Sequence, residues 1–543
     1  MSDHARALAA MRAVLGAEGV RADQATLERY AISCSGDGTR ALAVAYPVHT
    51  GQVVALVDIA RAHGLPIYPI STGKNWGYGD ACAPTDGQVI IELSRMNRIV
   101  HVDPVLCYAV VEAGVTQGQL SAHLRAHFPQ CWADCTGAGP DTSLVGNIVE
   151  RGFGHSPYGD RARHVAGMQV VLANGELLDT GFGHYPNAQA RYLFPYGIGP
   201  FLDGLFTQSN FGIVTQVGIW LMPAAPCINH FVCRLEDHAD IGPVVDALRP
   251  LRLDGSLRSV IHIGNDLRVL ASAQVSPQPS AALDGTSRAA LRARAGVGAW
   301  TVSGAVYGSV RQVALARHAL RQALRATRAR PHFISERKLA ALALAAKALA
   351  MLPVARSWTA RVALGRALLD MNRGIPDARF LAGAYWRRRG GLPADFPAGA
   401  DPARDGCGML WLSPILPLRG DHLLFVHALV EPVFAAHGFD LFATYSMVNE
   451  RSLCAIFSIV FARDDASEME RAKRCQREAF GVLMQAGYVP YRVGLASMAQ
   501  LDPAADAYWR TVGAIKQALD PAGIMAPGRY APAPPATRRP ASP

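Results

Sequence analysis

The feature that most constrains this chain is a glycine-rich stretch that follows an apolar run, Pro66–Gly79 with the sequence PIYPISTGKNWGYG. Because glycine has no Cβ, such a loop can bring a row of backbone N–H groups close to an anion, for example a pyrophosphate. It differs from a Walker loop, because Asn75 rather than Ser or Thr follows Lys74. No obvious helix follows, so it also fits a Rossmann loop poorly. From these residues alone, an anion cradle and an unliganded tight turn are equally good interpretations.

Length and charge set the class of protein. A chain of 543 residues is too long for one simple core, which predicts two or more domains. The net charge of +10 comes mainly from arginines spread along the chain, which predicts a generally basic surface. Since no basic tract is interleaved with aromatic residues, we expect no nucleic-acid partner. A basic face could instead steer an acidic redox partner or an anionic substrate.

Cysteine spacing and hydropathy indicate the compartment. The ten cysteines follow no CxxC, haem or zinc pattern, so we expect reduced thiols and no metal site. The N-terminal stretch lacks the order of a signal peptide. The most apolar long stretch, residues 339–355, is interrupted by Lys347 and contains Pro353, which favours a buried helix over a membrane span. We therefore expect a soluble, cytoplasmic protein without a membrane partner.

Hydrophobic periodicity predicts an alternation of strands and helices. The first half reads as helix over 5–30 and 51–63, the latter capped by Thr50, and as helix again after the N-cap Thr116. Asn174-Gly175 between two apolar runs predicts a hairpin. Beyond a boundary at Pro223–Pro226 the sequence pattern changes to long helical segments that alternate with strands. The expected elements there are helices over 312–329, 338–351 and 361–372 and strands over 422–426 and 454–461.

Several separate motifs then occur in an order that resembles one family. They are the opening loop, Asn147–Asp160, Leu172–Glu176, Gly199-Pro200 with Asp203-Gly204, Trp220–Pro223 and Leu519–Gly528. This pattern is similar to the vanillyl-alcohol oxidase / 4-cresol dehydrogenase family of FAD enzymes, and the resemblance covers about residues 30 to 530. It implies an α+β fold with a two-part FAD-binding domain, residues 1–225 and 490–530, and an α+β cap domain, residues 226–489. We expect the tail, 531–543, to be disordered.

The resemblance also implies which residues contact FAD. The opening loop would hold the diphosphate through its backbone, and further contacts would come from three later segments and from the C-terminal part. The expected cofactor-binding residues are Ser71, Thr72, Gly73, Lys74, Asn75, Trp76, Gly77, Gly79, Thr142, Ser143, Gly146, Asn147, Glu150, Arg151, Gly152, Gly212, Ile213, Val214 and Arg529.

For the substrate, the resemblance implies a para-substituted phenol that is bound as phenolate and loses hydride from its benzylic carbon to flavin N5. A p-quinone methide then adds water or loses a proton. A phenolate needs cationic or donor groups beside it. The family uses two tyrosines and an arginine for this purpose, which here fall on Tyr78, Tyr491 and Arg492.

The chain departs from the family pattern at the FAD tether. Many members attach FAD through a His or Tyr of the cap, and the corresponding position falls at about Leu453. The adjacent Cys454 could attack a flavin in principle, but a buried strand cysteine is usually inert. We therefore predict non-covalent FAD.

Two further departures concern proton transfer. Several members place an aspartate beside flavin N5. Here the first aspartate of that loop is kept as Asp134, and Asp141 either fills the second place or only caps the next segment, two equally good interpretations. His155 stands where a tyrosine is frequent, and we favour a role in acid–base chemistry over packing alone. Arg387 and Trp411 match motifs of the family's cap domain. They could line the pocket or serve structural packing, two equally good interpretations.

The sequence thus predicts an FAD-dependent oxidoreductase of 4-alkylphenols or 4-hydroxybenzylic alcohols. The alternatives are the same fold acting on another alcohol and a flavin-binding subunit without turnover. The flavin would be reoxidised by a cytochrome c-type partner or by dioxygen. The family usually forms dimers, so we also expect a homodimer.

Overall fold

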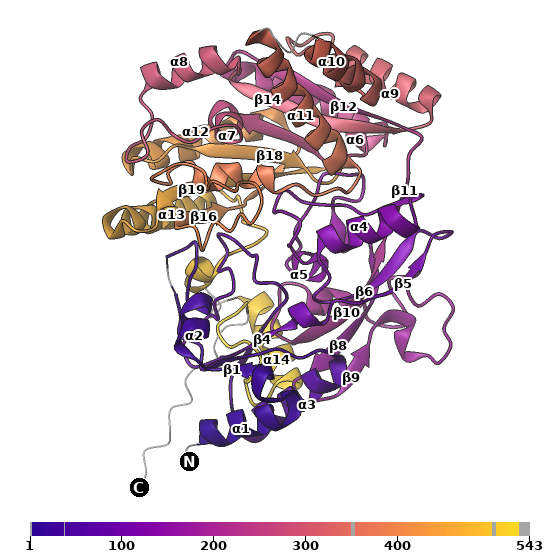
Figure 1. Cartoon of the computed structure of the whole chain (residues 1–543), viewed down its shortest axis with the longest axis vertical. Coiled ribbons are helices and arrows are strands. Elements are labelled where there is room, and N and C mark those ends of the chain that lie inside the picture. Colours follow the sequence, from indigo (N-terminus) through magenta and orange to yellow (C-terminus); the bar gives the residue numbers. More distant parts are fainter. Residues whose placement is uncertain (1–2, 37, 349–352, 502–505, 531–543) are drawn as a thin grey trace.

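The computed structural model describes residues 3–36, 38–348, 353–501 and 506–530. The tail predicted to be disordered lies outside these ranges. The chain forms two layered parts, with the N-terminal half and the C-terminal segment in one and the middle of the chain in the other (Figure 1). None of the helices in the described ranges is long and apolar enough to cross a membrane.

The first part contains two sheets. Parallel pairing of β2 and β3 with β4 builds a small sheet in the order β1-β2-β4-β3, and a second, antiparallel sheet has the order β5-β6-β10-β8-β9. Their strands are β1 (Val20–Arg21), β2 (Ala43–Ala45), β3 (Ile67–Ile70), β4 (Val89–Glu92), β5 (Ile99–Asp103), β6 (Tyr108–Glu112), β8 (Val165–Leu172), β9 (Leu177–Asp179) and β10 (Gly212–Trp220). A short pair, β7 (Cys131–Trp132) and β11 (Met222–Pro223), stands beside them.

Of the two N-caps predicted for helices of the first part, one is confirmed and one is wrong. The Thr116 hydroxyl caps α4 by accepting from the Gln119 N–H, as predicted, but α3 is capped by His49 instead of Thr50. The predicted hairpin at Asn174-Gly175 is confirmed by the pairing of β8 with β9. The helices are α1 (Asp3–Leu15), α2 (Gln24–Tyr30), α3 (Thr50–Ala62), α4 (Gln117–His127), α5 (Leu144–Val149) and α14 (Ala507–Leu519).

The C-terminal segment returns to the first part. α14 lies among the N-terminal elements in Figure 1, and the backbone of Ile67 in β3 bonds to Ile524 and Ala526. The same apolar core includes Ile524 and Met525 together with β3 and β4. Burial of this segment thus closes the first part around the glycine-rich loop that follows β3.

The second part is built on one eight-stranded sheet, in which β15-β12-β14-β13-β18-β19-β16 are successive neighbours and β17 also pairs with β19. Helices α6, α9, α12 and α13 contribute to the core on one face of this sheet. The strands are β12 (Cys227–Leu235), β13 (Ile261–Asn265), β14 (Trp300–Gly308), β15 (His332–Ile334), β16 (Cys407–Leu412), β17 (Ile415–Pro417), β18 (Phe442–Met447) and β19 (Ser452–Ala462). The helices are α6 (Ile241–Leu253), α7 (Asp266–Ala271), α8 (Gly285–Ala295), α9 (Val310–Ala323), α10 (Glu336–Ala348), α11 (Pro353–Asn372), α12 (Gly420–Ala436) and α13 (Ala466–Gln485).

One predicted element of this part is wrong. Residues 422–426 were expected to form a strand, but they lie in α12. The buried residues Leu423, Val426, Val430 and Val433 recur at helical spacing, a signal that only a window longer than five residues contains. Since β11 ends at Pro223 and β12 begins at Cys227, and since α13 ends at Gln485, we propose domain boundaries near residues 225 and 490.

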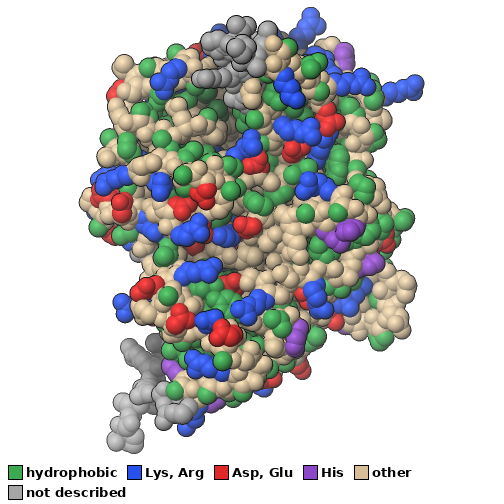
Figure 2. All heavy atoms as spheres, viewed as in Figure 1, with side chains coloured by type: hydrophobic (Ala, Val, Ile, Leu, Met, Phe, Trp, Pro, Cys, Tyr) green, Lys and Arg blue, Asp and Glu red, His purple; other side chains and the backbone are tan. Residues whose placement is uncertain are grey.

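The surface carries no concentrated basic patch on the face in Figure 2. Lys and Arg side chains are scattered over both parts of that face, with Asp and Glu side chains between them. This distribution matches the mixed surface that the dispersed arginines predict.

Candidate active site

A cavity of about 1240 Å³ lies between the two parts. On one side it is lined by the glycine-rich loop and by segments after β6 and around β10, and on the other side by the sheet of the second part. Alternate strand residues face it, because successive side chains of a strand point to opposite faces. His262 pairs in register with Ser303 and Ser446, and all three line the cavity.

The glycine-rich loop presents unpaired backbone donors to this cavity. In the described part of the chain, the N–H groups of Gly73, Lys74, Asn75 and Trp76 donate to no acceptor. Gly73 has a φ of +68°, which glycine adopts without strain. The Lys74 ammonium is already paired with Asp401 of the second part, with 2.7 Å between Nζ and Oδ2. The backbone, rather than the lysine, is therefore the group available to an anion.

Other polar atoms of the wall also lack partners. Asn210 Oδ1, His230 Nε2, Trp411 Nε1 and Arg529 Nη1 are buried, line the cavity, and make no hydrogen bond within the described residues. Unpaired buried polar atoms are costly, so a wall that carries several of them fits a bound polar group. Together with the row of free N–H groups, this wall fits a dinucleotide such as FAD.

Most residues that were expected to contact FAD line the cavity. They are Ser71, Thr72, Gly73, Lys74, Asn75, Trp76, Thr142, Ser143, Gly146, Asn147, Glu150, Gly152, Gly212, Ile213, Val214 and Arg529. Three others do not. Gly77 and Gly79 are buried behind the loop, and Arg151 is exposed, with its guanidinium bonded to Thr207. The cavity wall therefore gives no support to a direct contact of these three residues with the cofactor, and that contact stays a prediction.

The three residues expected to bind a phenolate are brought together, although they come from distant parts of the chain. The Arg492 guanidinium lies over the ring of Tyr78, 4.2 Å from its centroid, and Tyr491 precedes it in the cavity wall. The Tyr78 hydroxyl lies 2.5 Å from Ser413 Oγ, and its ring stacks on Trp411. Burial raises the pKa of Tyr78 to about 12, against the opposing charge of Arg492. Burial likewise raises the pKa of Tyr491. Both phenols therefore stay protonated donors at neutral pH.

Glu150 connects this cluster to the C-terminal segment. Its carboxylate accepts from Arg492 Nε at 3.2 Å, from Arg529 Nη2 at 2.8 Å and from the Tyr530 hydroxyl at 2.8 Å. Burial alone would raise the pKa of Glu150, but the two arginines and these hydrogen bonds hold it at about 2. Glu150 thus fixes the position of Arg492 and offsets part of its charge.

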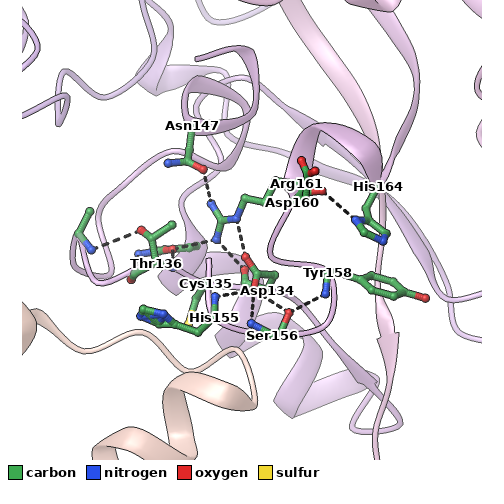
Figure 3. Close-up of polar contacts among 12 residues, drawn as sticks. Asp134, Cys135, Thr136, Asn147, His155, Ser156, Tyr158, Asp160, Arg161 and His164 are labelled. Atoms are coloured by element: carbon green, nitrogen blue, oxygen red, sulfur yellow. Dashed lines mark hydrogen bonds and ion pairs between the residues drawn. The ribbon is translucent and has the colours of Figure 1, made fainter. Parts of the chain in front are cut away.

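The two aspartates considered for proton transfer, Asp134 and Asp141, lie in different surroundings. Asp134 is buried and bonded by Arg161 Nε at 2.7 Å, by Ser156 Oγ at 2.6 Å and by the N–H of His155 and Ser156 (Figure 3). Its pKa is lowered because the charge of Arg161 and these bonds outweigh burial. Asp141 is exposed and does not line the cavity. The prediction that Asp141 serves as a base there is therefore wrong, and Asp134 instead orders the loop that carries His155.

His155 belongs to a group of three histidines that sequence reasoning only partly found. His155 Nδ1 lies 3.1 Å from His262 Nε2, and His262 Nδ1 lies 2.9 Å from Ser446 Oγ. Burial lowers the pKa of His155 to about 4 and that of His230 to about 3, and it lowers the pKa of His262 as well. All three are neutral near pH 7, so they can accept a proton there but are not charged acids.

The hydrogen bonds of Asn372 fix the tautomer of His230. The Asn372 Nδ2 donates to the Leu368 carbonyl, while its Oδ1 accepts from the Tyr307 hydroxyl. The same Nδ2 lies 3.2 Å from His230 Nδ1, which must therefore accept. The proton of His230 is on Nε2, and this buried N–H lines the cavity without a partner among the residues that the structure describes.

The position assigned to a covalent tether is wrong. Leu453 is fully buried in the core and pairs with Leu416, whereas the residues of β19 that line the cavity are Ile456, Ser458 and Val460. A shift of one residue moves a strand side chain to the opposite face. Burial raises the pKa of the Cys454 thiol, so it is a poor nucleophile. Non-covalent FAD stays a prediction.

The two cap residues with open interpretations have different surroundings. Arg387 is fully buried and paired with Glu468, 2.7 Å from Nη1 to Oε1, so it serves packing. Trp411 lines the cavity beside Tyr78. The sequence signal for His262 was the alternation Ile261-His262-Ile263, in which a polar residue stands between two buried ones.

The three neutral histidines predict a specific loss of stability in acid. The histidine pKa is about 6.5 in an unfolded chain, so between pH 6.5 and about 4 the unfolded state binds more protons. The free energy of unfolding should therefore fall as the pH drops through this window, by up to about 1.4 kcal/mol per pH unit for each histidine. Urea unfolding from pH 7.5 to 4.5 measures this slope. His262→Asn should flatten it and the exposed His184→Asn should not. An equal slope in both variants would contradict the assignment.

Comparison with known proteins supports FAD as the cofactor of this chain. Residues 41–181 match the model of an FAD binding domain. The chain is 37% identical to 1'-carboxy-chondrochloren decarboxylase of Chondromyces crocatus, with 97% of each chain covered. It is 31% identical to the 4-cresol dehydrogenase [hydroxylating] flavoprotein subunit of Pseudomonas putida, with 88% of this chain and 85% of the relative covered.

Two solved structures are similar over 97% of each chain. They are p-cresol methylhydroxylase with substrate bound, with a TM-score of 0.85 at 29% identity, and 4-ethylphenol oxidase from Gulosibacter chungangensis in an isoeugenol complex, with a TM-score of 0.85 at 28% identity.

Proposed function

The chain belongs to the vanillyl-alcohol oxidase / 4-cresol dehydrogenase family and is an FAD-dependent oxidoreductase, and from this premise we propose that it oxidises para-substituted phenols at the benzylic carbon. The observation that carries the proposal is the cluster of Tyr78, Tyr491 and Arg492, which lines the same cavity as the free N–H groups of the glycine-rich loop. The substrates named for the 4-cresol and 4-ethylphenol relatives support the same class.

In this proposal the cluster binds the phenol as phenolate. The positive charge of Arg492 and the two neutral tyrosine hydroxyls stabilise the negative oxygen and lower the pKa of the bound phenol. Ionisation pushes electron density toward the para carbon and makes its benzylic hydrogen a better hydride donor. Bound FAD supplies the hydride acceptor.

The histidines then handle protons. Loss of hydride from the phenolate leaves a p-quinone methide, which adds water at the benzylic carbon or loses a proton from the next carbon. Either outcome needs a base, and we assign this role to neutral His155. The proton that His155 accepts is shared through its hydrogen bond with His262, which Ser446 orients. His230 Nε2–H offers a fixed donor to the same cavity.

A second candidate function is oxidative decarboxylation, which the 37% identical decarboxylase favours. If the carbon next to the benzylic one carries a carboxylate, the electron pair of the C–CO₂ bond can form the new C=C bond. The quinone methide then returns to phenolate, and CO₂ leaves in place of a proton. Hydride transfer is the same in both functions, so CO₂ release distinguishes them.

The electron acceptor and the assembly remain proposals. The 4-cresol relative is a flavoprotein subunit, so we propose that a cytochrome c-type partner reoxidises the flavin, with dioxygen as the alternative. We also retain a homodimer and a cytoplasmic location as predictions. No cluster of metal ligands occurs among the described residues.

The function is tested by mixing the protein anaerobically with a panel of 4-alkylphenols and following the flavin absorbance. Bleaching by para-substituted phenols, and not by the corresponding O-methyl ethers, is expected. Tyr78→Phe should slow bleaching roughly 100-fold, because one donor to the phenolate is lost, with FAD content unchanged. The absence of bleaching by any phenol would favour a flavin-binding subunit without turnover, and bleaching by simple aliphatic alcohols would favour the same fold with another substrate.

A further inference from the structure

Arg268 is a charged residue of the cavity wall to which the reaction above assigns no role. It lies in α7, directly after β13, and its side chain packs across Gly264. A Cβ added to Gly264 would lie 3.7 Å from Arg268 Cγ. The guanidinium reaches the 3₁₀ helix Ala378–Tyr385, where a Cβ added to Gly383 would lie 2.9 Å from Arg268 Nη1. Both glycines line the cavity, so small residues leave the head group of Arg268 open to it.

Within the described part of the chain, this guanidinium has no acceptor. The other arginines of the cavity wall are paired: Arg379 with Asp377 at 2.7 Å, Arg234 with Glu236 at 2.8 Å, and Arg492 and Arg529 with Glu150. The nearby aspartate at the start of α7, Asp266, forms its ion pair with Arg288 instead. Burial lowers the pKa of Arg268, yet a guanidinium stays charged in proteins.

Arg268 is half-buried, and a charge without a partner in such a position is costly unless a ligand supplies the opposite charge. Arginine holds five N–H donors in a planar fork that matches a carboxylate with two parallel hydrogen bonds. The FAD diphosphate has its own donors in the backbone of the glycine-rich loop, which belongs to the opposite part of the chain. The ligand of Arg268 is therefore expected to be the substrate.

The position of Arg268 relative to the phenolate cluster sets the shape of this substrate. The Tyr78 hydroxyl bonds to Ser413, just after β16, and Arg268 follows β13, three strands away in the order β13-β18-β19-β16. Neighbouring strands lie about 4.8 Å apart, so the two backbones are separated by about 14 Å. An interval of this order suits a phenol ring with a short side chain. The helix Ala378–Tyr385, which Arg268 reaches, packs against both α7 and β16.

We propose that Arg268 is a specificity residue that binds the carboxylate of an anionic substrate, whose para-hydroxyphenyl ring is held by Tyr78, Tyr491 and Arg492. The inference rests on the proposed function and names its substrate class, a 4-hydroxyphenyl compound whose side chain ends in a carboxylate. The wall between the two ends carries Thr444 and Ser446 of β18. These hydroxyls suit a polar side chain rather than a plain alkyl chain.

The test compares two ligands that differ only in the last group of the side chain, 3-(4-hydroxyphenyl)propanoate with a carboxylate and 4-propylphenol with a methyl group. Each is titrated into the FAD-loaded protein, and binding is read from the difference spectrum of the oxidised flavin at once after mixing, before bleaching is followed. The wild-type protein should bind the propanoate more tightly. Arg268→Met should raise the dissociation constant of the propanoate roughly 10- to 100-fold and leave that of 4-propylphenol within about twofold. Arg268→Lys should retain part of the preference, because the charge remains and the fork is lost.

Arg379→Met is the matched control, since it removes another arginine of the same wall that already has a partner. It should change neither dissociation constant. Equal weakening of both ligands by Arg268→Met, no preference in the wild type, or loss of FAD from the variant would each overturn the proposal. If neither ligand bleaches the flavin but the preference exists and depends on Arg268, the carboxylate site stands and the proposed oxidation fails.

Discussion

Replacing Arg492 by leucine is expected to slow flavin reduction by a 4-alkylphenol roughly 1,000-fold while FAD stays bound. Arg492 places a positive charge against Tyr78, 4.2 Å from the centroid of its ring, and the wall beside it offers neutral tyrosine hydroxyls. Without this charge the bound phenol keeps its proton near neutral pH, and a neutral phenol is a poor hydride donor. Rapid anaerobic mixing gives the rate of bleaching.

Retention of FAD follows from the contacts of Glu150. Loss of Arg492 leaves this half-buried carboxylate with Arg529 at 2.8 Å and with the Tyr530 hydroxyl at 2.8 Å, so it keeps a counter-charge. Raising the pH toward the pKa of the free phenol should restore part of the rate in Arg492→Leu, because solvent then ionises the substrate. Arg419→Leu, which removes an exposed arginine, serves as the control. A wild-type rate in Arg492→Leu would refute the phenolate site.

Local sequence signals predicted the elements that hold the cofactor side of the cavity. The glycine-rich loop, the cap at Thr116 and the hairpin at Asn174-Gly175 depend on residues close together in the chain. Such local signals could not predict that Tyr78 lies beside Tyr491 and Arg492, because this contact depends on how the C-terminal segment folds back onto the first part. It came from resemblance to a family.

The sheet side of the cavity was largely missed, for a physical reason. Whether a strand residue faces the cavity or the helices depends on its parity within a sheet of eight strands, and the register is set by partners far away in sequence. Leu453 was placed on the wrong face for this reason, and His230, His262 and Arg268 were not recognised at all. Asp141 failed differently, because a motif with a changed spacing does not fix where the carboxylate points.

Replacing Gly77 by alanine is expected to abolish most FAD binding, although Gly77 does not line the cavity. Its φ of +75° strains any residue with a Cβ, at a cost of about 1–3 kcal/mol. The added Cβ would also lie 1.9 Å from Trp411 Cδ1, so the indole or the loop must move. Overpacking of this kind costs about 1–3 kcal/mol more. Because the free N–H groups of Gly73 to Trp76 directly precede Gly77, displacement of the loop would remove them from the diphosphate. The FAD content of the purified protein measures the loss.

A substitution at a second glycine, Gly87, distinguishes the effect of backbone strain from the effect of the collision with Trp411. Gly87 has a φ of +80°, and a Cβ added there would meet nothing within 4 Å, so Gly87→Ala carries the strain alone and should keep its FAD. The double variant Gly77→Ala/Trp411→Ala removes the atoms that collide and should regain FAD. It should not regain phenol oxidation, because Tyr78 loses the ring on which it stacks. If the double variant contains as little FAD as Gly77→Ala, the loss of FAD is caused by backbone strain and not by the collision with Trp411. If Gly77→Ala binds FAD normally, the loop is not the diphosphate site.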